Sequence, residues 1–219
     1  TSRAILGFRL CLRQITDLDK LANLSSKVEE ISGLVRHWKF DNQEANVSKA
    51  NVGGFDAKLM GGAKLVPGKI GNAVEVDGER GYVDFGMGAG DTDGNFTVSF
   101  FIRYLNKEGH EGYTRIFSNK KAFNGNDGLQ LSLLSKREQG RTDQQVWIRG
   151  SSNKGFGKKV TNSWKAGNWH HLVVSFEGEK ASIYSDGKSK GTGKVTPVVN
   201  GLKNFTFSTN LKGYQFHGQ

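Results

Sequence analysis

Residues 95–104, NFTVSFFIRY, decide the fold, because their side chains alternate with the period of two that a β-strand imposes. One set is apolar and the other carries the polar groups: Phe96, Val98, Phe100 and Ile102 against Thr97, Ser99, Phe101 and Arg103. We expect the first set to lie in the core and the second to face away from it. A strand with one apolar face needs a second layer of structure to cover that face.

Short apolar runs of the same kind follow one another from residue 34 onward, separated by turn signals such as DGERG, GNDG and SDGKSKG. The expected strands are 34–40, 56–60, 73–77, 81–85, 95–104, 114–119, 128–134, 144–149, 158–163, 169–177, 180–185, 189–196 and 202–209. Since such strands must cover one another, they predict an all-β fold of two stacked antiparallel sheets.

The first 32 residues have a different character. Residues 5–12 are strand-like, whereas residues 16–31 have helical spacing, with an apolar stripe of Leu18, Leu21, Val28 and Ile31. Thr16 and Asp19 resemble a capping box at the start of that helix. We therefore expect a strand and a connector helix in residues 1–32, and the sandwich in residues 33–219.

Composition agrees with a β-rich domain and narrows the partners. The 219 residues include 30 Gly, 2 Pro and 14 Phe, as expected of aromatic-rich strands joined by tight turns. The single cysteine, Cys11, excludes an intrachain disulfide and a zinc site of several thiolates.

The net charge of +10 favours an anionic partner. The basic residues are scattered, no phosphate-cradling loop precedes a helix and no apolar stretch is long enough to span a membrane, so neither nucleic acid nor a membrane span is expected.

Several segments, in order and spacing, match one known pattern: LVRHWKFD (34–41), VPGKIGNAVEVDGERGYVDFG (66–86), NFTVSFFIRY (95–104), IFSNK (116–120), GLQLSLL (128–134) and GNWHHLVVSFEGEKASIYSDGKSKG (167–191). They resemble the laminin-G-like domains of the concanavalin A-like lectin/glucanase superfamily over roughly residues 33–219. The resemblance implies a curved antiparallel β-sandwich, or jelly roll, without catalytic activity, in a secreted or cell-surface multidomain protein. It implies glycan or protein ligands, sometimes with one calcium ion. Such domains close with a strand after a phrase like FHG, so that strand is expected to be incomplete here.

Residues 5–12, ILGFRLCL, also resemble the closing GFRL strand of the formylglycine-generating, sulfatase-modifying family. That resemblance implies a larger upstream domain, with residues 16–31 as the connector. A strand that simply pads the sandwich is the alternative.

The motif EVDGE, residues 75–79, places three carboxylates at alternate positions and raises the possibility of a glycosidase. However, an Asp-Gly pair between two apolar strands predicts a hairpin corner. Glu79 would then lie in the turn, apart from Glu75, and the carboxylates would not converge. We therefore expect no catalytic residue here and no enzyme activity.

The middle of the chain is the best candidate for ligand binding. Trp164 has polar neighbours in the sequence and is expected to be exposed, ready to stack on a sugar. Basic residues that match sulfate or carboxylate oxygens lie near it in the sequence: Arg141, Arg149, Lys158, Lys159 and Lys165. Trp38 and Trp169 lie in apolar strands and are expected in the core.

Two further groups of residues, a pair of histidines and three aspartates, allow a structural as well as a functional interpretation. His170 and His171 are adjacent on a strand and point to opposite faces, so they cannot chelate one metal; we expect one of them to be buried and hydrogen-bonded. Asp41, Asp56 and Asp186 lie at loop positions where the family binds calcium, and ordinary turn aspartates are the alternative. No other cofactor is expected.

The sequence therefore favours a carbohydrate-binding or adhesion module, extracellular or at the cell surface, for an acidic polysaccharide or glycoconjugate. One alternative is a structural spacer that packs against neighbouring domains of its parent chain. Another is a glycoside hydrolase or polysaccharide lyase of the same fold.

Overall fold

The computed structural model describes residues 10–11, 34–41, 43–86, 95–105, 112–120, 128–135, 145–150, 155–159, 164, 166–195, 204–209 and 216–219. Its strands are β1 Leu10–Cys11, β2 Leu34–Arg36, β3 Gln43–Glu44, β4 Val47–Ser48, β5 Ala57–Met60, β6 Lys64–Pro67, β7 Asn72–Asp77, β8 Tyr82–Asp84, β9 Phe96–Ile102, β10 Gly112–Ser118, β11 Gln130–Ser135, β12 Gln145–Arg149, β13 Gly155–Lys159, β14 His170–Glu177, β15 Lys180–Ser185, β16 Lys188–Lys194, β17 Thr206–Ser208 and β18 His217–Gly218. Within these ranges there is no helix with the length and apolar character that a membrane crossing requires.

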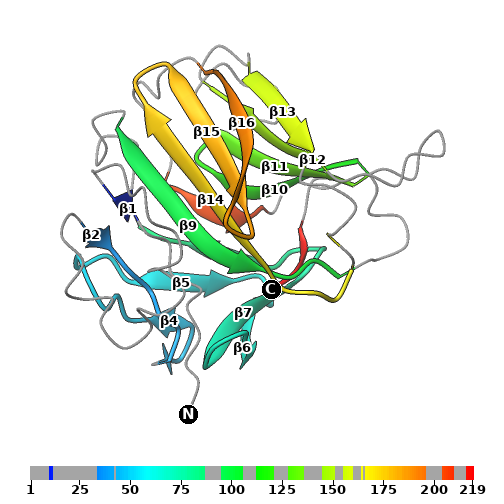
Figure 1. Ribbon diagram of the computed structural model, residues 1–219. Helices are drawn as coiled ribbons and strands as arrows, with labels where there is room; N and C mark the ends of the chain where they lie inside the picture. Colours follow the sequence, from blue (N-terminus) through cyan, green and yellow to red (C-terminus); the bar gives the residue numbers. More distant parts are fainter. Residues whose placement is uncertain are drawn as a thin grey trace.

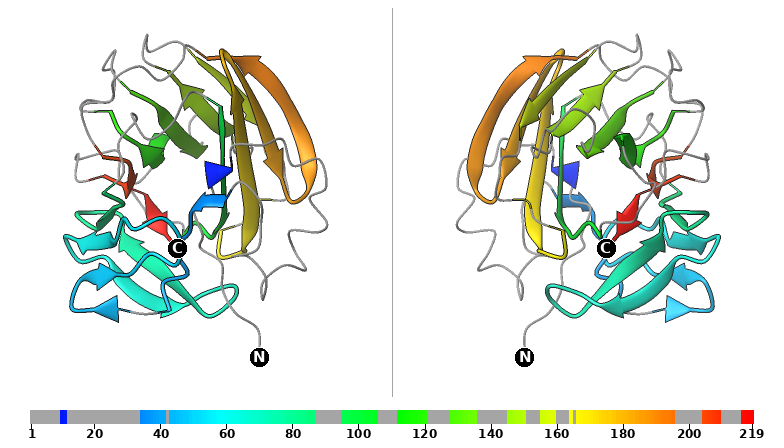
Figure 2. Two further views of the ribbon diagram at one scale, coloured as in Figure 1. Left: turned by 90° about the vertical axis from the view of Figure 1, so that its left-hand side faces the viewer. Right: turned by 90° about the vertical axis from the view of Figure 1, so that its right-hand side faces the viewer.

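The strands form two layers, as the sequence predicts (Figure 1). One layer is a nine-stranded sheet in the order β13-β12-β11-β10-β17-β8-β5-β4-β3. The second layer combines the sheet β16-β15-β14-β9 with the sheet β18-β7-β6. An antiparallel bridge between Tyr104 and Gly218 joins these two parts, so β18 links β9 to β7. Figure 2 shows β14–β16 on one side of the molecule and β10–β13 across from them.

The core lies between the two layers and is rich in aromatic side chains. The four apolar residues of β9 are at most 2% exposed, which confirms that they face the core, while Thr97 and Ser99 on the opposite face are also buried, at 8% and 7%. From the nine-stranded sheet, Phe117 stacks on Phe205 with their ring centroids 4.4 Å apart. Trp38, predicted to be in the core, is fully buried beside Phe85 and donates its indole N–H to the Phe55 carbonyl. These aromatic contacts stabilise the inner face of the nine-stranded sheet.

Most predicted strands are present, and the differences concern short elements. The strands β3, β4, β6 and β18 are missing from the prediction, because two to four residues are too few to show a period. The predicted helix at 16–31 lies outside the described residues, and the boundary at residue 33 stays a prediction. Of the N-terminal segment, β1 is described, and it pairs with β2 (Leu10 opposite Arg36).

The Asp77–Gly78 corner is confirmed, but the predicted hairpin is wrong. β7 ends at Asp77, and Gly78 adopts a φ of 72°, which glycine tolerates well. The flanking strands do not pair with each other, because β7 pairs with β6 and β18 while β8 pairs with β5 and β17. The turn instead carries the chain from one layer to the other.

Asp77 organises this turn. Its Oδ1 atom accepts the backbone N–H groups of Glu79, Arg80 and Gly81 at 2.8, 3.1 and 3.0 Å. Partial burial raises the pKa of the Asp77 carboxyl, but the three N–H donors outweigh it, and the pKa is lowered. Asp77 is therefore a structural carboxylate that stays ionised at neutral pH.

We expect Asp77→Ala to lower the free energy of unfolding by about 2 kcal/mol, because the three N–H groups lose a charged acceptor. Asp77→Asn keeps an oxygen acceptor without the charge and is expected to lose less. Since the folded-state pKa is below the unfolded one, this stabilisation is present above the unfolded-state pKa and is lost as the pH falls through the folded-state value. Urea denaturation from pH 7 down to pH 2 measures both effects; equal stability of the three proteins at pH 7 would contradict the role of Asp77.

Candidate functional site

The outer face of the second layer brings together one residue from each of five strands or strand ends. Lys64 on β6 lies opposite Glu75 on β7. Gln219 follows β18 and lies between Glu75 and Arg103. The backbone N–H of Gln219 donates to the Arg103 carbonyl, and the backbone N–H of Arg103 donates to the Gln219 carbonyl. Trp169 precedes β14. It lies opposite Arg103, because β14 and β9 are antiparallel and His170 pairs with Ile102. We call Lys64, Glu75, Gln219, Arg103 and Trp169 the cross-strand row.

Side-chain contacts run along most of the row. The Lys64 Nζ atom lies 3.0 Å from Glu75 Oε1. The Gln219 side chain donates from Nε2 to Glu75 Oε2 at 2.7 Å and accepts at Oε1 from the Arg103 guanidinium. At roughly 4.8 Å between neighbouring strands, the row is about 19 Å long, a length that accommodates several sugar units.

Arg103 is the second cation of the row, and within the described part of the chain it has no ion pair. Its guanidinium carbon lies 5.1 Å from the ring centroid of Trp169, in cation–π contact. No carboxylate of the described residues lies within ion-pair distance of Arg103. The side chain is half-buried, and its position is fixed by Trp169 on one side and Gln219 on another. A held guanidinium with donors to spare binds planar or tetrahedral oxyanions well.

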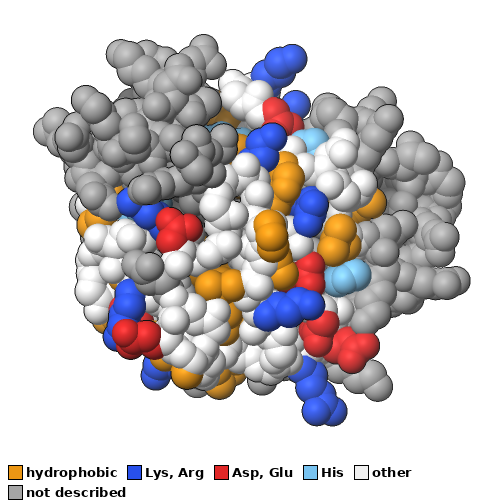
Figure 3. All heavy atoms as spheres, turned by 90° about the horizontal axis from the view of Figure 1, so that it is seen from below, with side chains coloured by type: hydrophobic (Ala, Val, Ile, Leu, Met, Phe, Trp, Pro, Cys, Tyr) orange, Lys and Arg blue, Asp and Glu red, His pale blue; other side chains and the backbone are white. Residues whose placement is uncertain are grey.

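The row is reachable from solvent at Lys64, Glu75 and Trp169, whereas Gln219 is buried, with 3% of its surface exposed. The Lys64 side chain is 66% exposed and that of Glu75 is 23% exposed. Trp169 is half-buried, so the prediction that it lies in the core is only partly right: it packs against the core and also contacts Arg103. Figure 3 views the molecule from the side of β4, β6 and β7 in Figure 1. On that face, hydrophobic side chains lie among basic, acidic and histidine side chains.

The carboxylates near the row are poorly suited to acid catalysis. The hydrogen bond from the Gln219 amide lowers the pKa of the Glu75 carboxyl; partial burial opposes this effect, and Lys64 adds to it. The pKa of Asp77, two residues along, is lowered as well. A general acid needs a pKa near the working pH, so neither carboxyl has the proton that a glycosidase must donate.

The expectation that Trp164 is exposed is wrong. Its side chain is 4% exposed and stacks on His170, with ring centroids 4.7 Å apart and planes 10° from parallel. The indole N–H donates to the Ser185 hydroxyl at 2.8 Å. Polar neighbours in the sequence suggested exposure, whereas a buried cluster with strand residues encloses the ring. Trp164 therefore offers no face to a sugar.

Three of the predicted basic residues are described, and they lie on β12 and β13. Arg149 is half-buried on β12, in the nine-stranded sheet. Lys158 and Lys159 belong to β13, opposite Val146 and Gln145. The remaining two, Arg141 and Lys165, lie outside the described residues. A ligand site that includes these basic residues stays a prediction, without a stacking face from Trp164.

His170 and His171 lie on opposite faces, as predicted. His170 is buried, and its Nδ1 lies 3.0 Å from Asp186 Oδ2. His171 is half-buried on the outer face, where it stacks on Phe101 and its Nε2 lies 2.9 Å from the Ser99 hydroxyl. The first histidine anchors a strand, as the sequence indicates.

The three aspartates predicted for calcium have separate positions. Asp56 accepts from the Lys49 ammonium and the Ala50 backbone N–H, which lower its pKa. Asp186 accepts from the His171 backbone N–H, while Asp41 is exposed. Across the part of the chain that is described, no three His, Cys, Asp or Glu side chains are grouped to hold a metal ion. The interpretation as turn aspartates is therefore favoured for Asp56 and Asp186.

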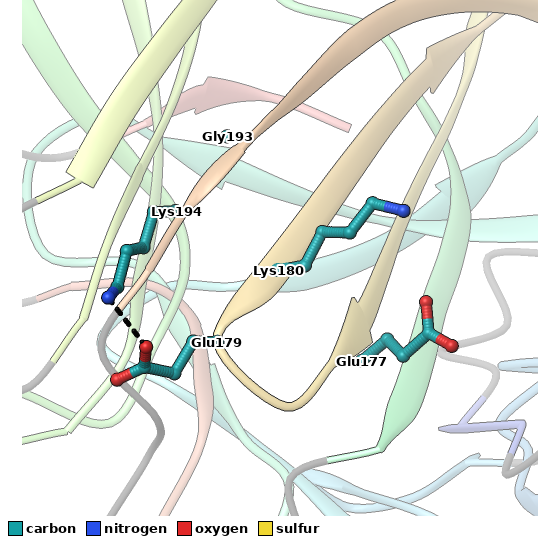
Figure 4. Close-up of a pocket in the computed structure, with 5 residues that line it drawn as sticks. All are labelled: Glu177, Glu179, Lys180, Gly193 and Lys194. Atoms are coloured by element: carbon teal, nitrogen blue, oxygen red, sulfur yellow. Dashed lines mark ion pairs between the residues drawn. The ribbon is translucent and has the colours of Figure 1, made fainter.

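An open hollow of about 350 Å³ lies at the turn between β14 and β15, lined by Glu177, Glu179, Lys180, Gly193 and Lys194. Figure 4 shows Lys194 and Glu179 pointing toward each other, in an ion pair of 2.7 Å, while Glu177 and Lys180 extend on the other side. Two cations and two anions balance, and no aromatic side chain lines the hollow. It lacks the features of a glycan site.

Sequence reasoning missed the cross-strand row. The alternation of residues 95–104 correctly places Arg103 on the outer face. It does not show that Gln219, 116 residues later, lies beside it, or that Gln219 also contacts Glu75, 144 residues earlier. The predicted strands 95–104 and 169–177 contain Arg103 and Trp169, but their sequences do not show that these two residues lie opposite each other.

The model of the concanavalin A-like lectin/glucanases superfamily matches residues 77–218. No curated protein matches. Among solved structures, domain 4 of AbnA, a GH43 extracellular arabinanase from Geobacillus stearothermophilus in complex with arabinotriose, is 20% identical with a TM-score of 0.59. The match covers 84% of this chain and 87% of that one.

Two larger proteins contain a similar fold as one part. Trypanosoma rangeli sialidase is 15% identical with a TM-score of 0.58, over 86% of this chain and 29% of the sialidase. The enzymatically active domain of tailspike protein 2 from bacteriophage CBA120 is 12% identical with a TM-score of 0.54, over 74% of this chain and 27% of that one. At these identities the similarity shows the fold alone. With the family match over more than half of its length, the chain belongs to the concanavalin A-like lectin/glucanases superfamily.

Proposed function

We propose that the chain is a non-catalytic binding module for an acidic polysaccharide or glycoconjugate, and that the cross-strand row is its binding surface. The observation that carries the proposal is Arg103, a half-buried guanidinium held by Trp169 and Gln219, with no carboxylate partner among the described residues. An acidic group of the ligand supplies that partner. The hydroxyl groups of neighbouring sugars bind the Glu75 carboxylate, which the Gln219 side chain, itself only 3% exposed, holds in place.

Three further facts support this proposal. The net charge of +10 attracts anionic polymers. The lowered pKa values of Glu75 and Asp77 disfavour acid catalysis at this surface. Domain 4 of the arabinanase, a relative of similar length, was solved with an arabinose oligomer bound. A polysaccharide ligand also fits a parent protein that acts outside the cell or on its surface.

Calorimetric titration with oligogalacturonate, and with its methyl ester as the uncharged analogue, tests the proposal. We expect the acid to bind more tightly than the ester, and salt to weaken the binding of the acid. Arg103→Gln and Trp169→Ala are each expected to raise Kd at least tenfold, a change of about 1.4 kcal/mol, because the first removes the cation and the second its support. Thermal unfolding of each variant checks that the fold persists.

Arg149→Gln is the matched control, since it removes the same charge from the other layer. It is expected to leave Kd within about twofold, because a cation in the other layer, far from the ligand, contributes little in salt. If Arg149→Gln weakens binding and Arg103→Gln does not, the site lies on β12 and β13 instead. If no uronic-acid or sulfated glycan binds at all, the polysaccharide proposal is wrong.

A further inference from the structure

The charges of the cross-strand row alternate in sign. Arg103 is positive, Gln219 is neutral, Glu75 is negative and Lys64 is positive. Glu75 lies two strand spacings from Arg103, or roughly 10 Å. A polysaccharide that runs along the row therefore passes from a cation to a fixed anion within the length of about two sugars.

Glu75 is held in its place and in its charged form. The Gln219 amide and the Lys64 ammonium both contact its carboxylate, at 2.7 and 3.0 Å. The Gln219 side chain contacts Glu75 and Arg103 at once, so the two charges have a fixed relative position. With 23% of the Glu75 side chain exposed, its charge faces any ligand seated beside it.

We propose that Glu75 makes this surface selective for polysaccharides with isolated acidic groups and against densely charged ones. This inference rests on the function proposed above. When an acidic group occupies Arg103, the chain passes the buried Gln219 and its next sugars lie beside Glu75. Neutral sugars there donate hydroxyl hydrogen bonds to the Glu75 carboxylate, which a carboxylate accepts well. A second acidic group at the same place meets the carboxylate as a like charge at short range.

Lys64 does not remove this discrimination. Its ammonium is 66% exposed and lies on the far side of Glu75 from Arg103, so it attracts an anion only beyond the Glu75 carboxylate. The row thus favours one acid followed by neutral sugars, a spacing found in sparsely acidic or partly esterified chains. A fully acidic homopolymer of the same length does not have that spacing.

The test compares oligogalacturonates of one length and two esterification levels: fully acidic and mostly methyl-esterified. The unaltered protein is expected to bind the sparsely acidic form more tightly. In Glu75→Gln, affinity for the fully acidic form is expected to rise about tenfold, while affinity for the sparse form changes less than about threefold. Glutamine retains an acceptor for the Gln219 amide, so the row keeps its geometry.

Glu79→Gln is the charge-matched control, since it removes the same charge from the exposed turn after β7. It is expected to leave the ratio of the two affinities unchanged. Lys64→Gln keeps Glu75 and removes its neighbouring cation, so the preference for the sparse form is expected to increase. If Glu75→Gln leaves the ratio unchanged while Arg103→Gln still abolishes binding, the selectivity proposal fails and the binding function stands. If Arg103→Gln has no effect on either ligand, the binding function itself fails.

Discussion

Trp164→Ala is expected to lower the free energy of unfolding by about 3–5 kcal/mol, as measured by urea denaturation. The indole is 4% exposed, so its removal leaves a cavity that the surrounding strands cannot close completely. It also ends the ring stack on His170 and leaves the Ser185 hydroxyl without its donor. Ser185 and His170 both contact Asp186, so the loss extends to the turn after β15.

Two variants separate the contributions of Trp164. Trp164→Phe keeps a ring on His170 but loses the N–H donor, and is expected to lower stability by about 1–3 kcal/mol. Trp147→Ala, at a half-buried position on β12, is expected to lower it less than Trp164→Ala. If Trp164→Ala lowers stability by less than about 1 kcal/mol, the ring is exposed, as its sequence context suggested, and the buried cluster is wrong.

Gly218→Ala is expected to lower stability by about 3 kcal/mol and to weaken glycan binding at least tenfold. A Cβ atom on Gly218 would lie 2.1 Å from the Arg103 carbonyl oxygen and 2.8 Å from Tyr104 Cα. Both neighbours are backbone atoms that cannot rotate away. β18 must therefore shift from β9, and Gln219 shifts with it, away from Arg103 and Glu75.

Gly54→Ala is the control for a glycine substitution without a clash. Gly54 has a φ of +75° but no atom within 4 Å of an added Cβ. It is expected to lose about 1–2 kcal/mol through backbone strain and to bind glycan normally. Normal binding by Gly218→Ala would contradict the placement of Gln219 in the cross-strand row.

The sequence predicts features that depend on neighbouring residues better than features that depend on contacts between distant parts of the chain. The faces of β9 and the opposite orientations of His170 and His171 follow from local alternation, and both are confirmed. The corner at Asp77–Gly78 is also local. Which strands pair across that corner is decided by the whole sheet, and there the prediction of a hairpin is wrong.

The functional surface depends on contacts that are distant in sequence. Trp164 is buried because Ser185 and His170 meet it in space, which its polar neighbours in the chain do not show. β18 is two residues long, too short for any periodic signal, yet it sets the position of Gln219 between β7 and β9. A pattern of charges along a single strand contains no information about a row that crosses five strands.

The indole N–H signals in a ¹⁵N–¹H correlation spectrum test the binding surface most directly. The chain has 4 Trp, so there are four signals, assignable by single Trp→Phe variants. On titration with oligogalacturonate, the Trp169 signal is expected to shift most, because the ligand binds the Arg103 guanidinium that lies over its ring. The Trp38 and Trp164 signals are expected to stay in place, since both N–H groups donate inside the protein. A shift at Trp147 with no change at Trp169 would contradict the cross-strand row as the site.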